Sequence, residues 1–193
     1  MFQVRVHGRG GQGVVTAAEV LSVAAFLEGR HAQAFPSFGS ERTGAPVVSF
    51  CRIDDRPVRV REPISAPDAV LVQDATLLHQ VDLFAGLRPA GWVLVNSTKT
   101  VADLGLTDLA AIVPAGHLLT VPASDLARAH IGRPLPNAAL LGGFTAASGV
   151  VGIEALADAI RDLIPAAYVD GNVAAARAAH DHVATEMKEL ADA

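Results

Sequence analysis

Residues 2–13 read Phe-Gln-Val-Arg-Val-His-Gly-Arg-Gly-Gly-Gln-Gly, and this stretch decides the fold prediction. Apolar and polar side chains alternate over Phe2–His7, which is typical of a strand. Residues 8–13 fit the pattern G-x-G-x-x-G, and apolar residues then recur at helical spacing from Val14 to Ala25, up to Gly29. A strand, a glycine turn and a helix in this order predict the first unit of an α/β sheet.

Strands and helices are expected to alternate along the rest of the chain. Further strands are predicted at His31–Phe35, Ala69–Gln73, Trp92–Asn96 and Leu118–Pro122. A hairpin is predicted from Val47–Ile53 and Pro57–Val60, with Asp54, Asp55 and Arg56 in its turn. Helices are predicted at Thr76–Leu87, Ser124–His130, Ala138–Ser148, Ile153–Ile164 and Gly171–Ala191. The pattern indicates one domain over residues 1–193, a three-layer, Rossmann-like α/β fold with a mostly parallel sheet and an inserted β-hairpin.

The composition narrows the class of protein. The 193 residues are 51% hydrophobic and 18% charged, and their mean hydropathy is +0.36, which excludes a disordered chain. A net charge of −5 gives no support to nucleic-acid binding. With no apolar run as long as a membrane span and no signal-peptide pattern, we expect a cytoplasmic protein. The single cysteine, Cys51, excludes an internal disulfide, a thiolate zinc site or an iron–sulfur cluster held by this chain alone.

The glycine turn is the first candidate binding site. Glycines let backbone N–H groups approach a ligand, and the helix N-terminus adds donors and a partial positive charge, so the turn favours a phosphate-type ligand. The alternative is a turn that only packs the first helix on the sheet. An NAD site also needs an acidic residue at the end of the second strand, and the chain has none there before Glu41.

A second unusual segment covers residues 37–46, Ser-Phe-Gly-Ser-Glu-Arg-Thr-Gly-Ala-Pro. We expect it at the same edge of the sheet as the glycine turn. Arg42 is suited to bind two phosphate or carboxylate oxygens, and Ser40 and Thr43 would add hydroxyl donors. The alternative is an interface or turn loop in which Glu41 and Arg42 are solvated or paired with each other.

Other polar residues carry weaker signals. The seven histidines are scattered and form no metal-ligand spacing, and only His7, directly before the glycine turn, is a candidate for ligand contact. Arginines 52, 56, 59 and 61 indicate either a solvated face or a docking surface for an acidic neighbouring subunit. No metal site and no catalytic side chain is assigned to the chain.

Three motifs in order support a more specific interpretation. They are V-x-G-x-G-G-Q-G from Val6, S-F-G-S-E-R-T-G-A-P-V from Ser37, and S-F-C-R-I-D-D-R-P-V-R from Ser49. Together they resemble the gamma subunit of the 2-oxoacid:ferredoxin oxidoreductases, most closely in the pyruvate branch. The resemblance extends over most of the chain, including Val93–Ser97 and Pro136–Gly143.

The resemblance implies a subunit of a complex that converts a 2-oxoacid to an acyl-coenzyme A and that is inactive alone. Thiamine diphosphate, Mg and 4Fe–4S clusters would lie on partner subunits, namely the alpha, beta and ferredoxin-like delta chains. Electrons would pass to ferredoxin or, through another subunit, to NAD. The gamma subunit would help to bind coenzyme A and would cover the active site. The 2-oxoacid stays open between a pyruvate-like acid and an aromatic one such as phenylglyoxylate.

The resemblance also implies site residues by position. The phosphate-binding loop would comprise Gly8, Gly10, Gly11, Gln12, Gly13, Val14 and Thr16. The second loop would comprise Ser37, Gly39, Ser40, Glu41, Arg42, Thr43 and Gly44. Two departures weaken charge-based capture of coenzyme A: Thr43 stands where the family commonly has an Arg, and Glu19 stands near where fused members carry a Lys. The alternatives are a stand-alone nucleotide-binding regulatory domain and a purely structural subunit.

Overall fold

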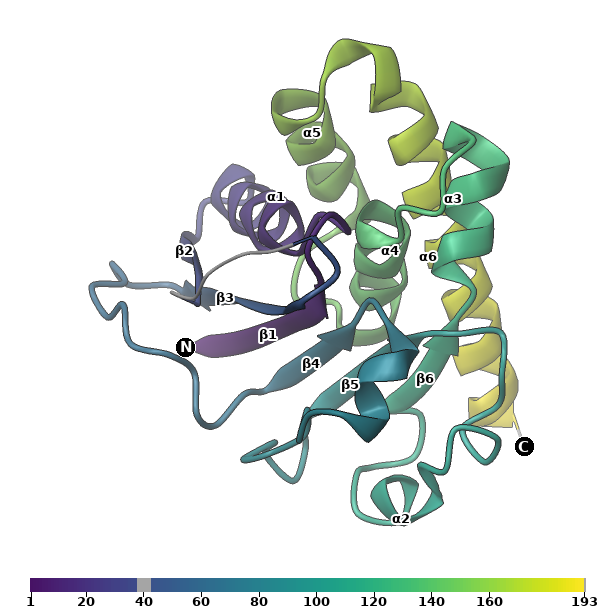
Figure 1. The fold of residues 1–193 in the computed structure, drawn as a ribbon. Helices are drawn as coiled ribbons and strands as arrows, with labels where there is room; N and C mark the ends of the chain where they lie inside the picture. The colour runs from purple at the N-terminus through teal and green to yellow at the C-terminus, as the bar shows by residue number, and fades with distance from the viewer. Residues whose placement is uncertain (38–42, 193) are drawn as a thin grey trace.

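The computed structural model describes residues 1–37 and 43–192, which form a six-stranded mixed sheet with helices (Figure 1). The strand order is β2-β3-β1-β4-β5-β6. The strands are β1 (Phe2–Arg9), β2 (His31–Pro36), β3 (Pro46–Asp54), β4 (Ala69–Val72), β5 (Trp92–Asn96) and β6 (Leu118–Val121). The helices are α1 (Val14–Leu27), η1 (Ala75–His79), α2 (Thr107–Ala110), α3 (Ala123–Ile131), α4 (Asn137–Ser148), α5 (Ile153–Leu163) and α6 (Ala166–Asp192).

The sheet is parallel on one side of β1 and antiparallel on the other. Strands β1, β4, β5 and β6 pair in parallel, and the apolar runs of β4 and β5 are buried, as expected for central parallel strands. Strand β3 runs antiparallel to both of its neighbours, β1 and β2. The α/β prediction is confirmed, with an antiparallel hairpin of β2 and β3 inserted after α1.

The hairpin lies elsewhere than the sequence indicated, and this prediction was wrong. Residues 57–60 form no strand, because β3 is an interior strand whose two edges are already paired with β1 and β2. The segment instead crosses the sheet as an irregular strap (residues 55–65) fixed by buried arginines. Arg52 donates to the carbonyl oxygens of Val60 (3.1 Å) and Glu62 (2.7 Å), and Arg5 donates to that of Ile64 (3.5 Å). Arg52 therefore does not belong to a solvated face, whereas Arg56, Arg59 and Arg61 are exposed.

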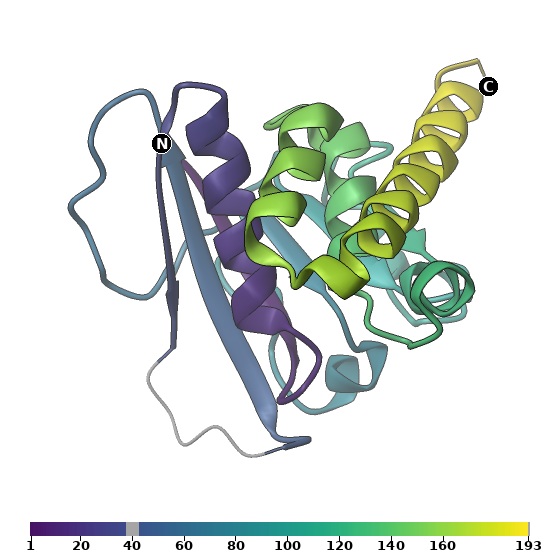
Figure 2. The same ribbon diagram turned by 90° about the horizontal axis from the view of Figure 1, so that it is seen from above.

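The layers on the two sides of the sheet differ in thickness. Helices α1 and α4 lie against one side, and α5 and α6 pack beside them, as the view from above shows (Figure 2). Their core is rich in Ala, Val and Leu and includes the fully buried Phe144. The other side is covered by η1, α2 and loops around a smaller core that includes Val70, Leu77 and Leu83. In residues 1–37 and 43–192, no helix combines the length and the apolar character that crossing a membrane requires.

Two helix predictions need correction. Thr76–Leu87 is not one helix: η1 spans five residues, and Arg5 Nη2 then bonds the carbonyl oxygens of Leu83 and Ala85, both at 2.8 Å, which a continuing helix would use for itself. The last helix begins at Ala166 rather than Gly171, because Gly171 lies inside α6 and packs against the end of α3. The remaining predicted strands and helices lie within about two residues of the observed bounds.

Candidate functional site

The glycine loop connects the carboxyl end of β1 to the start of α1. Gly13 precedes the helix with φ +70°, a left-handed conformation that favours glycine. The first helical hydrogen bond runs from the Ala17 N–H to the Gly13 carbonyl (2.9 Å), and no side chain caps the helix. Within the described residues, the N–H groups of Val14, Val15 and Thr16 therefore have no acceptor. The helix also has no acidic residue in its first turn, so these donors and the positive end of the helix dipole remain available to an anion.

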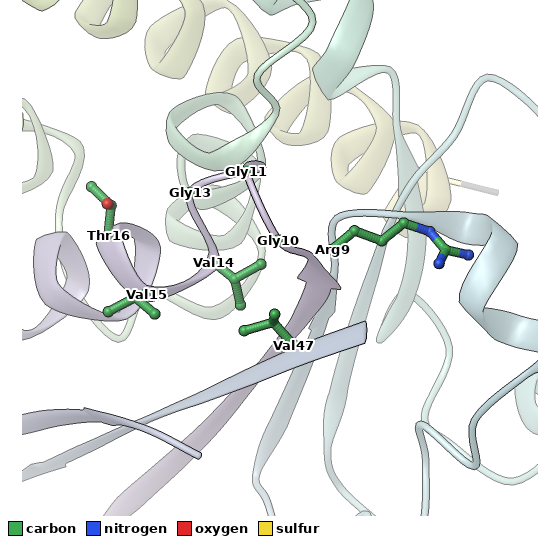
Figure 3. A pocket seen from close by; sticks show the side chains of 8 residues that line it. All are labelled: Arg9, Gly10, Gly11, Gly13, Val14, Val15, Thr16 and Val47. Atoms are coloured by element: carbon green, nitrogen blue, oxygen red, sulfur yellow. The ribbon is translucent and has the colours of Figure 1, made fainter. Parts of the chain in front are cut away.

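A small pocket lies at these free donors (Figure 3). It has a volume of about 160 Å³ and is lined by Arg9, Gly10, Gly11, Gly13, Val14, Val15, Thr16 and Val47. Five of the predicted site residues thus meet here: Gly10, Gly11, Gly13, Val14 and Thr16. Pockets for whole small molecules usually measure roughly 300–1,000 Å³. The described residues therefore enclose space for a single anionic group rather than a whole cofactor.

Two other predicted residues of this loop, Gly8 and Gln12, support its structure instead. A Cβ atom on Gly8 would lie 2.7 Å from Val14 Cγ2, so Gly8 allows α1 to approach the sheet closely. The Gln12 side chain accepts a hydrogen bond from the Arg9 N–H (2.8 Å) and donates one to the Asp74 carboxylate (2.9 Å). Both residues shape the loop, and neither lines the pocket.

An ion pair that sequence reasoning missed holds the loop in place. Arg9 Nε lies 3.2 Å from Asp74 Oδ2, and the Arg9 guanidinium also donates to Thr76 Oγ1 (2.7 Å), to Gln80 Oε1 (3.1 Å) and to the Gly44 carbonyl (3.1 Å). In Figure 3 the Arg9 side chain points away from the start of α1. Arg9 thereby ties the glycine loop to η1 and to the segment around Gly44. The available signals were an Arg between the glycines and an Asp just after a buried strand.

The charge state of Asp74 fits this role. Burial alone would raise the pKa of this carboxyl group, but hydrogen bonds from Thr76 and Gln12 and the charge of Arg9 lower the pKa overall. Asp74 is therefore ionised at neutral pH and accepts hydrogen bonds from three neighbouring side chains.

The second predicted loop meets the first at Gly10. Gly10 and Thr43 form a parallel bridge, the Gly10 N–H donates to the Ala45 carbonyl (2.9 Å), and the Gly44 N–H donates to the Gly10 carbonyl (3.1 Å). Thr43 and Gly44 thus lie at the edge of the sheet where the sequence predicted them. Ser37 follows β2, and its N–H donates to the Val48 carbonyl (2.9 Å). Four further predicted residues, Gly39, Ser40, Glu41 and Arg42, lie outside the described residues.

His7 and Cys51 are buried beside the loop and in β3, respectively. Burial and, to a lesser degree, the charge of Arg5 lower the pKa of His7 to about 4, so its imidazole is neutral at pH 7. His7 does not line the pocket. Burial raises the pKa of the Cys51 thiol to about 12, which confirms a buried strand residue rather than a nucleophile. No group of three or more His, Cys, Asp or Glu residues in the described part of the chain is arranged to hold a metal ion.

Asn137 is a second residue that sequence reasoning missed. It is the first residue of α4, and its Nδ2 lies 2.5 Å from the position that a Cβ atom on Gly13 would take. The start of α4 therefore covers the glycine loop, about 120 residues away in sequence. The signal available was Pro136-Asn137 at the start of a predicted helix.

The fold and the pocket together define an α/β domain with a candidate anion-binding loop at a strand–helix junction. Residues 3–182 match the family described as pyruvate ferredoxin/flavodoxin oxidoreductase, and the chain belongs to this family. It is 48% identical to the pyruvate synthase subunit PorC of Methanosarcina barkeri, over 83% of this chain and 85% of the relative. It is 45% identical to the pyruvate/ketoisovalerate oxidoreductases common subunit gamma of Pyrococcus furiosus, over 98% and 100%.

A solved structure supports the same assignment. The crystal structure of the pyruvate oxidoreductase subunit PORC from Thermotoga maritima superimposes with a TM-score of 0.77 at 34% sequence identity, covering 93% of this chain and 95% of that one. The resemblance inferred from the three motifs is therefore confirmed, and the chain corresponds to a gamma subunit of this family.

Proposed function

We propose that this chain acts within a multi-subunit, thiamine-diphosphate-dependent 2-oxoacid:acceptor oxidoreductase and binds the diphosphate of coenzyme A at its glycine loop. The observation that carries the proposal is a set of three N–H groups, on Val14, Val15 and Thr16, that have no acceptor within residues 1–37 and 43–192 and lie beside a pocket of about 160 Å³. Backbone donors fixed in this way would place the phosphates, and thereby the thiol, without any rearrangement at the moment of reaction.

The single cysteine of this chain supports a division of labour in which partner subunits carry the redox centres. One cysteine, buried and with a raised pKa, cannot ligate a 4Fe–4S cluster by itself. By the family resemblance, we assign thiamine diphosphate, Mg and the clusters to alpha, beta and ferredoxin-like delta partner subunits, with ferredoxin as the acceptor. This chain would contribute binding and exclusion of water at the active site, not the redox chemistry.

The pocket is too small for coenzyme A, so other groups must complete the site. The proposal includes the second loop, of which Thr43 and Gly44 lie beside Gly10. A partner subunit would supply the remaining contacts and any missing positive charge.

We further propose that partner subunits choose the 2-oxoacid. The Pyrococcus furiosus relative is described as common to pyruvate and ketoisovalerate oxidoreductases, which fits a gamma subunit that does not discriminate between these acids. A pyruvate-like acid is accordingly the first substrate to assay.

A stand-alone NAD-binding role is disfavoured by the topology. The strand beside β1 on the α1 side is the antiparallel β3, and β2 lies one strand further out at the edge of the sheet. A dinucleotide site of the Rossmann type needs a parallel second strand with an acidic residue at its end, next to the first.

The test uses a pair of variants in the reconstituted complex that are matched in shape and differ in charge. Val15→Glu places a carboxylate among the free donors, and Val15→Gln has almost the same shape without the charge. We expect Glu to raise the KM for coenzyme A about 30-fold and Gln to raise it less than about fivefold, with kcat little changed. An acidic residue in the first turn also stabilises a helix, so the Tm of the Glu variant should not fall.

This design separates binding from folding. Equal KM values for the two variants would show that the loop does not bind an anion. That result would favour the purely structural alternative, in which the subunit contributes packing only.

A further inference from the structure

The strap (residues 55–65) is an exposed segment that the proposed function does not use. It belongs to the connection between β3 and β4, residues 55–68, which contains no helix or strand. A connection of this length without secondary structure is uncommon in a compact domain and is usually either functional or disordered. The strap projects near the N-terminus, from the side of the sheet opposite to α1 and α4 (Figure 2). Its outer side chains are therefore open to a partner.

Buried side chains hold the backbone of the strap in one conformation. Arg52 is 4% exposed and donates to the carbonyl oxygens of Val60 and Glu62. Arg5 is 8% exposed and donates to the carbonyl oxygen of Ile64. A segment that is fixed in this way loses little conformational entropy when it binds. The strap is thus preorganised for contact with another molecule rather than disordered.

The charges on the strap are unevenly paired. Asp54, directly before the strap, pairs with the N-terminal amino group (3.0 Å), and Asp55 pairs with Arg30 (3.2 Å). Three exposed arginines form no ion pair with any residue among 1–37 and 43–192, and they are Arg56, Arg59 and Arg61. Within the same residues Glu62 is also in no ion pair, so three cationic groups stand against one anionic group. A chain with a net charge of −5 thus gathers unpaired positive charge on one short segment.

An exposed apolar residue separates two of these arginines. Val60 is 44% exposed and lies between Arg59 and Arg61 in the sequence. Its carbonyl oxygen accepts from Arg52 (3.1 Å) and, in the amide orientation that satisfies both amide groups, from Gln33 of β2 (2.8 Å). The backbone at Val60 is therefore fixed with the side chain exposed. Arginines beside an apolar contact are typical of protein–protein interfaces, whereas binding to nucleic acid depends mainly on cations that meet phosphates.

We propose that the strap docks onto an acidic surface of a partner subunit in the oxidoreductase complex. Carboxylates of the partner pair with Arg56, Arg59 and Arg61, since a guanidinium group can donate two parallel hydrogen bonds to one carboxylate. Val60 packs against apolar atoms of the partner between these pairs. The inference rests on the proposed function, because it needs the multi-subunit complex, but it does not depend on what the glycine loop binds.

The first test measures how tightly this chain binds a complex assembled from the other subunits. Arg56→Gln/Arg59→Gln should raise the Kd about 30-fold at about 50 mM salt, and by a smaller factor at about 500 mM salt, because salt screens exposed charges. The matched control is Arg128→Gln/Arg161→Gln, which removes the same charge from exposed arginines on α3 and α5. This control should change the Kd less than about threefold.

The second test asks whether carboxylates lie opposite the strap. In the assembled complex that contains Arg59→Lys, a carbodiimide should join the introduced amine to an Asp or Glu side chain of a partner subunit. Mass spectrometry of the digested complex identifies the two linked residues. Arg128→Lys is the control and should give no cross-link between subunits.

Equal Kd values for the two double variants would overturn the inference, as would the absence of a cross-link between subunits from Arg59→Lys. A weaker affinity of Arg56→Gln/Arg59→Gln for a single-stranded oligonucleotide, with subunit binding unchanged, would assign the strap to nucleic acid and also overturn it. If Val15→Glu still raises the KM for coenzyme A in these cases, the proposed function stands. If the wild-type chain does not bind the other subunits, both proposals fail.

Discussion

The two halves of the glycine loop differ in how their polar groups are used. On the side of η1, Arg9, Gln12 and Asp74 bond to one another and to their neighbours, and we call this the locked half. On the side of α1, the N–H groups of Val14, Val15 and Thr16 have no acceptor within the described chain, and this is the open half. The comparison shows how the described residues of the loop can attract an anion through the backbone: side chains fix the loop, and the N–H groups at the start of α1 present the donors.

The largest predicted effect concerns His7, which lies under the loop and must stay neutral there. Its pKa is lowered from 6.5 to about 4, so between these pH values the unfolded chain takes up a proton that the folded chain does not. The free energy of unfolding should therefore decrease as the pH falls from about 6.5 to 4, by up to about 3 kcal/mol from this residue.

Urea titrations of the purified chain at several pH values would measure this loss. The variant His7→Phe should remove most of it. His79→Gln, at an exposed position, is the control and should retain the wild-type slope. If the free energy of unfolding of His7→Phe falls with pH as steeply as that of the wild type, His7 is not the source of the loss.

The next prediction concerns a substitution that disrupts the locked half directly. Asp74→Asn leaves the Arg9 guanidinium without its carboxylate, which should lower the free energy of unfolding by about 2 kcal/mol. The pKa of Asp74 is lowered in the fold, so its contribution is present at neutral pH and is lost as the pH falls through the folded pKa. If the locked half positions the open half, the same variant also raises the KM for coenzyme A.

The control for Asp74 is Asp125→Asn, which removes an exposed partner of Arg128 and should cost less than about 0.5 kcal/mol. A destabilised Asp74→Asn complex with an unchanged KM would show that the two halves act independently.

A smaller effect compares two glycines of the loop. Both Gly11 (φ +94°) and Gly13 (φ +70°) disfavour a side chain, but only at Gly13 would a Cβ meet a neighbour, Asn137. Gly11→Ala should cost about 1 kcal/mol and Gly13→Ala about 2 kcal/mol in thermal unfolding. The added variant Asn137→Ala should reduce the difference between them, and additive effects would argue against the contact.

The smallest effect concerns ionic strength. Because the open half carries partial charges of the backbone rather than charged side chains, the contribution of this loop is screened only weakly. Between about 50 and 300 mM salt, the difference in KM between Val15→Gln and the wild type should change less than about twofold. A tenfold change would point to a charged side chain that contributes to anion binding at this loop.

The sequence predicted the strand–turn–helix unit and the meeting of the two loops, because glycine spacing and strand ends are local signals. It did not predict Arg9–Asp74 or Asn137, whose partners come from distant elements brought together only by packing. The hairpin was predicted in the wrong place for a similar reason. Residues 47–53 have the pattern of a strand, but this pattern does not indicate that the strand pairs along both edges, with β1 and β2. Arg5 and Arg52 likewise bind backbone carbonyl oxygens in two irregular segments, where the local patterns had favoured a helix and a strand, respectively.

The position of β3 between β1 and β2 has a consequence for how the chain folds. Residues 2–54 contain β1, α1, β2 and β3, and these four elements contact one another extensively. The contacts join segments close in sequence, which favours rapid formation, whereas the parallel strands need later crossovers. During synthesis the N-terminal quarter can therefore assemble first, with β1 presenting its free edge as the template on which β4 and the remaining strands are added.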